Sequence, residues 1–158
     1  GGNTSQQILD SRVVLWKGHC SVHQMFRPEH VHQFRQKIPD IKILVHPECP
    51  QEVNELADIS GSTSTILKTV QQAPPGSKWA IGTELHLVNR IKKEHPDQEV
   101  HFLSPVVCMC ATMYRIDLAH LAWSIENLVE GEVVNQIEVE ETTARNSLVA
   151  LERMLEVR

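Results

Sequence analysis

The sequence has few aromatic residues, no long apolar run and no excess of positive charge. Only 4% of its 158 residues are aromatic and its formal net charge is −5, which argues against a stacking surface for single-stranded nucleic acid and against a binder of the phosphate backbone. Its longest apolar runs are too short to span a membrane. The polar N-terminal segment lacks the apolar core of a signal peptide. We therefore expect a cytoplasmic protein that binds neither nucleic acid nor membrane.

Metal-ligating residues, in contrast, are plentiful. The chain carries nine His and four Cys. With no secretion signal the compartment is expected to be reducing, and there cysteines more often bind metals or react than form disulfides. The length suits one ordinary domain, or one and a half small ones.

Short apolar runs alternate with stretches of helical periodicity, which predicts βαβ units, an α/β fold and a mostly parallel sheet. Strands are expected at 12–18, 40–45, 78–83 and 99–103. Helices are expected from residue 21 to about 34 with a break at Pro28, and at 51–58, 61–70, 85–94, 117–129 and 142–157. Ser21 and Gln24 have the spacing of a capping box at the start of the first helix.

Reactive and metal-binding side chains follow the predicted strands. In an open α/β sheet the ligand crevice lies beyond the carboxyl ends of the strands, so we expect these side chains to share one rim of the sheet. In chain order they are Cys20, His23, His46, Glu48, Cys49, Ser62, Thr63, Glu84, Cys108 and Cys110.

The cysteines of this rim are not all expected to be metal ligands. Cys20 precedes a predicted helix, whose N-terminus favours a thiolate and hence a metal ligand; the alternative is a buried apolar thiol. His23 faces the same way one turn later and is either a ligand of substrate or metal, or a structural histidine. Cys49 is interpreted as buried, and one of Cys108 and Cys110 as a spare.

Two further groups suit anions and proton transfer. The Gly61-Ser62-Thr63-Ser64 stretch combines a helix start with free hydroxyls, as an anion cradle does, whereas an ordinary N-cap accounts for only one hydroxyl. His46 and Glu48 form a candidate acid–base pair, the alternative being a solvated loop carboxylate.

Six stretches, taken together and in order, resemble the quinolinate synthase family in its longer, three-domain form. They are LWKGHCSVH (15–23), LVHPECP (44–50), GSTS (61–64), WAIGTE (79–84), HLVNR (86–90) and CATMYRI (110–116). Members of that family are iron–sulfur enzymes of NAD biosynthesis that condense iminoaspartate with dihydroxyacetone phosphate to quinolinate. The resemblance also implies a functional link to the aspartate-oxidising enzyme that supplies iminoaspartate.

The resemblance implies roles for individual residues. Cys20 and Cys110 correspond to two of three cysteines that hold a [4Fe–4S] cluster with one open iron, which acts as a Lewis acid. His23, His46, Ser62 and Thr63 correspond to substrate-binding residues, and His46 and Glu48 to catalytic ones. Cys49 and Cys108 do not fall on ligand positions.

The family is substantially longer than this chain, and its first cluster cysteine lies upstream of the matching stretches. The resemblance therefore implies a C-terminal part of the enzyme, with an α/β/α sandwich at 19–104 that carries the substrate motifs. Residues 1–18 would end the preceding domain, and 105–158 would supply the cluster loop and helices that pack on the first domain. We expect the 158 residues alone neither to assemble a stable cluster nor to turn over. The competing interpretations are a zinc module using Cys20, His23 and Cys110, and a metal-free α/β module.

Overall fold

The computed structural model describes residues 17–156, and the chain divides into two compact units between Ala111 and Thr112. Each unit is considered by itself. The strand expected at 12–18 falls mostly outside the described residues. No helix among residues 17–156 combines the length and the apolar composition that crossing a bilayer requires.

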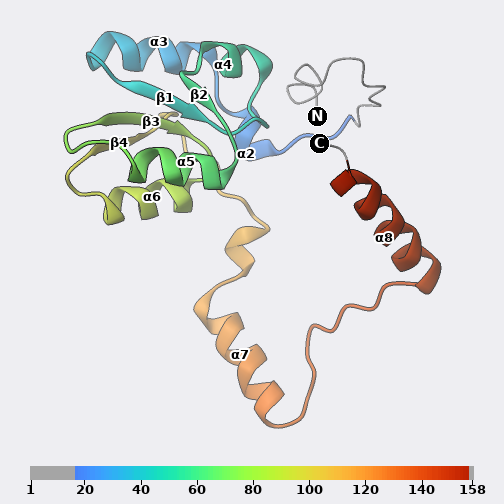
Figure 1. Ribbon diagram of the computed structural model, residues 1–158. Helices are drawn as coiled ribbons and strands as arrows, with labels where there is room; N and C mark the ends of the chain where they lie inside the picture. Colours follow the sequence, from blue (N-terminus) through green and yellow to red (C-terminus); the bar gives the residue numbers. More distant parts are fainter. Residues whose placement is uncertain (1–16, 157–158) are drawn as a thin grey trace. The chain divides into compact units, whose positions relative to one another are not determined.

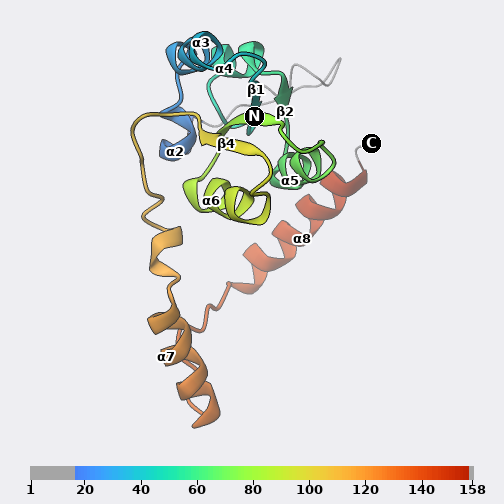
Figure 2. The same cartoon turned by 90° about the vertical axis from the view of Figure 1, so that its left-hand side faces the viewer.

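The first unit is an α/β sandwich. Its four parallel strands lie in the order β2-β1-β3-β4. Helices α3 and α4 cover one face of the sheet, and α5 and α6 cover the other (Figures 1 and 2). The elements are α2 (Ser21–Gln24), α3 (Pro28–Lys37), β1 (Lys42–Val45), α4 (Gln51–Leu56), β2 (Ile59–Ser60), α5 (Thr63–Gln71), β3 (Lys78–Gly82), α6 (Leu85–Glu94) and β4 (Glu99–Phe102). The predicted α/β class and parallel sheet are confirmed.

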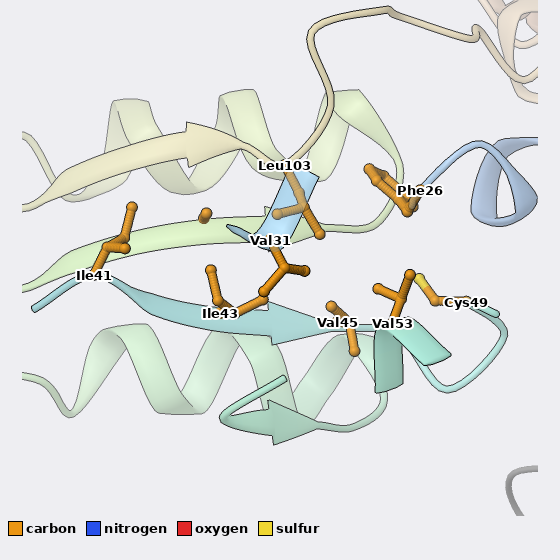
Figure 3. Packing of buried hydrophobic residues seen from close by; sticks show 9 residues of the cluster. Phe26, Val31, Ile41, Ile43, Val45, Cys49, Val53 and Leu103 are labelled. Carbon is orange, nitrogen blue, oxygen red and sulfur yellow. The ribbon is translucent and has the colours of Figure 1, made fainter. Parts of the chain in front are cut away.

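Alternation along the strands builds a separate apolar core on each face, because successive side chains of a strand point to opposite sides. On β1, Ile43 and Val45 pack toward α3 and α4, whereas Leu44 packs toward α5 and α6. Figure 3 shows the first core, in which Val31 of α3 and Val53 of α4 meet the strand. Because helices cover both faces and the core side chains are buried, we expect ligand-binding side chains at the ends of the strands.

The predicted break at Pro28 is confirmed, since α2 ends at Gln24 and Pro28 is the first residue of α3. The predicted capping box is wrong. Cys20, not Ser21, is the N-cap of α2, and no side chain caps that helix. The two-residue strand β2 was not predicted, because two residues are too few to show the alternation of apolar and polar side chains that marks a strand.

The second unit contains a short 3₁₀ turn (Met113–Arg115), α7 (Leu118–Val129) and α8 (Glu141–Glu156). Asp117 is the N-cap of α7 and accepts a hydrogen bond from the backbone N–H of His120. Neither helix buries a residue, and Leu118, Val129 and Leu155 are among the apolar side chains left exposed. The two predicted helices are confirmed, but they form no core within the described structure.

Candidate functional site at the carboxyl ends of the strands

The hydrogen bonding of the sheet brings the predicted site residues to one edge. Beyond the end of β1, the backbone N–H of His46 donates to the carbonyl of Gly82, the last residue of β3, at 3.0 Å. On the other side of β1, the N–H of Gly61 donates to the carbonyl of Val45 at 3.0 Å. The loops after β1, β2 and β3 therefore start next to one another, as the rule for parallel sheets predicts.

Three potential metal ligands meet at this edge. Cys20 and His23 come from the start of α2, and Glu48 comes from the loop after β1; their donor atoms lie within 4.8 Å of one another. Oε2 of Glu48 is 3.0 Å from Nδ1 of His23 and 3.9 Å from Nδ1 of His46. The rings of the two histidines stack with centroids 4.6 Å apart. The structure thus brings together four of the residues that the sequence proposes.

His23 is the most deeply placed of these residues. Its side chain is only 10% exposed, and its Nδ1 pairs with Oε2 of Glu48 at 3.0 Å. Its buried Nε2 has no hydrogen-bond partner among the described residues. Burial lowers the pKa of His23 and the neighbouring His46 lowers it further, while Glu48 and Glu84 act in the opposite direction. The lowered pKa favours the neutral ring, and its Nε2 is the position available to a ligand.

Glu84 lies at the same edge, two residues after β3. Its side chain is 12% exposed. Oε2 accepts a hydrogen bond from the backbone N–H of His86 at 2.8 Å and so caps α6. The buried Oε1 has no hydrogen-bond partner within residues 17–156, although Nδ1 of His86 is 3.6 Å away. In the sequence, Glu84 was marked as a candidate only by its position after a predicted strand, and that position did not indicate what the side chain does.

Ser62 and Thr63 open α5 at this edge. Ser62 is the N-cap, and its Oγ accepts a hydrogen bond from the N–H of Thr65 at 3.2 Å. That hydroxyl is thus engaged as an ordinary cap. The side chain of Thr63 is exposed at the first helical position. Their role in binding an anion stays a prediction.

The four cysteines fall into different environments. Cys49 is 2% exposed, and its Sγ donates to the carbonyl of Gly82 at 3.3 Å, in agreement with its interpretation as a buried thiol. Cys20, Cys108 and Cys110 are half-buried. Cys108 lines a pocket of about 350 Å³ beside Arg27. Cys110 lies in the irregular segment after β4 and is not part of the group formed by Cys20, His23 and Glu48.

Comparison with known proteins places the chain in a family. A family model described as "Quinolinate synthetase A protein" matches residues 1–156. The quinolinate synthase of Rhodopirellula baltica is 70% identical over all 158 residues. Those of Herpetosiphon aurantiacus and Bacillus subtilis are 51% and 52% identical over 99% and 92% of the chain. The chain spans about 40% of the length of these relatives. It belongs to the quinolinate synthetase A protein family.

Proposed function

We propose that this chain is part of a quinolinate synthase, which condenses iminoaspartate with dihydroxyacetone phosphate to quinolinate, phosphate and water in the cytoplasm. The observation that carries the proposal is the meeting of Cys20, His23, His46 and Glu48 at the carboxyl edge of the sheet. The relatives bear the same name, and the family match covers nearly the whole chain. In this proposal, residues 105–158 pack on another domain of the longer enzyme, which would cover the exposed apolar side chains of α7 and α8.

The donors in the chain suit a [4Fe–4S] cluster that is completed from elsewhere in the enzyme. Cys20 and Cys110 belong to the same unit and are half-buried, so both thiols are accessible to a cluster. Two thiolates are fewer than the three or four that such clusters use. The third thiolate would come from the part of the relatives that the chain does not span. When bound, a cluster with one open iron supplies a Lewis acid that polarises a hydroxyl or a carboxylate.

The other residues of the site handle protons and anionic groups. Glu48 lies within 3.9 Å of both histidine rings, which suits proton transfer between a carboxylate and an imidazole. The stacked ring of His46 holds His23 in place, so that a nitrogen of His23 can bind a substrate oxygen. Backbone N–H groups at the start of α5, with the hydroxyls of Ser62 and Thr63, would bind a carboxylate or the phosphate.

A chimera tests the proposal. The segment of the Rhodopirellula enzyme that matches this chain is replaced by residues 1–158, and the purified chimera is reconstituted with iron and sulfide without oxygen. We expect quinolinate to form from iminoaspartate and dihydroxyacetone phosphate. Glu48→Gln is expected to lower turnover by roughly 10²–10⁴-fold, the usual contribution of a general acid or base.

Cysteine variants of the same chimera test the cluster assignment. Cys110→Ser is expected to lose the visible iron–sulfur absorbance, whereas Cys108→Ser, changed two residues away, is expected to keep it. A chimera that folds and holds its cluster but makes no quinolinate would refute the proposed activity. Equal loss of absorbance in both serine variants would refute the choice of Cys110. The 158-residue polypeptide on its own is expected to show neither a stable cluster nor turnover.

A further inference from the structure

We propose that Glu84 is a further substrate-binding residue, whose Oε1 accepts a hydrogen bond from an N–H or O–H group of the bound substrate. Two groups of this chemistry are available, the imine nitrogen of iminoaspartate and the hydroxyl of dihydroxyacetone phosphate. The inference rests on the proposed function, from which it takes the two substrates, and it adds a residue from the loop after β3 to those that the sequence motifs suggest.

Glu84 reaches the edge of the sheet from β3. It lies two residues after Gly82, the last residue of that strand, whose carbonyl accepts a hydrogen bond from the N–H of His46 at 3.0 Å. The loop that carries Glu84 therefore starts beside the loop after β1. Burial lowers the pKa of His23, and the negative charge of Glu84 acts against that shift, so the carboxylate is close enough to influence the histidine ring.

The two oxygens of Glu84 differ in their contacts. Oε2 accepts a hydrogen bond from the N–H of His86 at 2.8 Å and caps α6. Oε1 is buried and accepts no hydrogen bond from any residue in the range 17–156. Nδ1 of His86 lies 3.6 Å from it, which permits an ion-pair contact but is too long for a hydrogen bond. One oxygen is enough to cap a helix, so the cap does not explain why Oε1 is also buried.

A buried carboxylate oxygen needs a hydrogen-bond donor. Removing such a group from water is costly, and native proteins nearly always give it a partner. An ionised carboxylate can only accept hydrogen bonds, so the partner that suits Oε1 carries an N–H or an O–H. The same charge repels the carboxylates and the phosphate of the substrates, which the start of α5 is proposed to bind. Glu84 is therefore suited to the substrate groups that are not anionic, and it would fix their orientation.

The test is the steady-state kinetics of the reconstituted chimera that carries Glu84→Gln. Glutamine keeps the size of the side chain and an oxygen for the α6 cap, but it removes the charge. We expect KM for one substrate to rise at least tenfold, as the loss of a hydrogen bond to a charged group does, and KM for the other to change less than twofold. A rise for iminoaspartate identifies the imine nitrogen as the donor, and a rise for dihydroxyacetone phosphate identifies the hydroxyl. Glu84→Asp keeps the charge and a favourable N-cap, so it should recover part of the loss.

Two controls separate substrate binding from a structural role. Glu84→Gln should not lower the urea midpoint of the chimera, because an amide is less costly to bury than a carboxylate. His86→Gln removes the imidazole beside Oε1 and should leave both KM values unchanged. A lower midpoint with unchanged KM values, or the same rise in KM for His86→Gln as for Glu84→Gln, would overturn the proposal.

The kinetics also distinguish this inference from the proposed function. An active parent chimera whose KM values do not change in Glu84→Gln would refute the role of Glu84 alone. A parent chimera that holds its cluster but makes no quinolinate would refute the proposed function, and the role of Glu84 with it.

Discussion

Cys49 is expected to be the one cysteine of the four that resists alkylation while the protein is folded. It is buried against Val53 at the edge of the first core (Figure 3). Its Sγ also donates to the carbonyl of Gly82. The other three cysteines are half-buried, so the contrast can be measured within a single molecule.

The structure sets the size of the effect. Burial raises the pKa of the Cys49 thiol from 9.0 to about 12, although the backbone hydrogen bond with His46 acts in the opposite direction. Only the thiolate reacts with alkylating reagents. At pH 8 this rise lowers the thiolate fraction about a thousandfold, and restricted access of the reagent slows the reaction further.

The assay is a time course of iodoacetamide labelling at pH 8 under reducing, metal-free conditions, read by intact mass and peptide mapping. Cys20, Cys108 and Cys110 should label in one early phase, and Cys49 at least a hundredfold more slowly. In urea all four should label at similar rates, and Cys49→Ala should lack the slow phase. Labelling of Cys49 within tenfold of Cys108 in the folded chain would refute the reasoning.

Three further predictions concern the stability of the first unit, measured by urea unfolding. A Cβ at Gly82 would lie 2.9 Å from Cδ2 of Leu103, so Gly82→Ala should cost about 1–3 kcal/mol; an unchanged midpoint would contradict it. Gln98→Leu should cost about 1–3 kcal/mol, because Nε1 of Trp79 loses its acceptor at 2.6 Å and stays buried. Desolvation raises the pKa of Asp58, but the hydrogen bond from Ile43 N and the charges of Arg35 and Lys42 outweigh it and lower the pKa overall. The stabilisation by Asp58 is therefore present above its unfolded pKa of about 3.9 and lost as pH falls through the lower folded value. Asp58→Asn should differ most from the parent near neutral pH and least in acid, and a constant difference would exclude this role.

The parts of the fold that the sequence predicts well are those with long periodic signals. The helix expected at 85–94 is α6 to the residue, because its apolar positions repeat at helical spacing between a turn and a His-Pro pair. The strands at 78–83 and 99–103 are each one residue shorter in the structure. The helix expected from residue 21 begins at Ser21, but its N-cap is Cys20 rather than Ser21, because a helix of four residues has too few positions to show which one is the cap.

The site shows the same difference between features set by regular structure, which the sequence predicts, and features set by loops, which it does not. Parallel strands end at a common edge, so the presence of His23, His46 and Glu48 at one rim follows from chain order alone. The 3.0 Å approach of Glu48 to His23 does not, because it depends on how the loop after β1 is tied to α2 by Gln24. Cys108 and Cys110 are the residues whose roles depend most on a loop conformation. They lie in a segment without periodicity, so neither pattern nor topology distinguishes the two thiols. Only the resemblance selects Cys110 as a ligand of the proposed cluster, and the paired serine variants put that choice to a direct test.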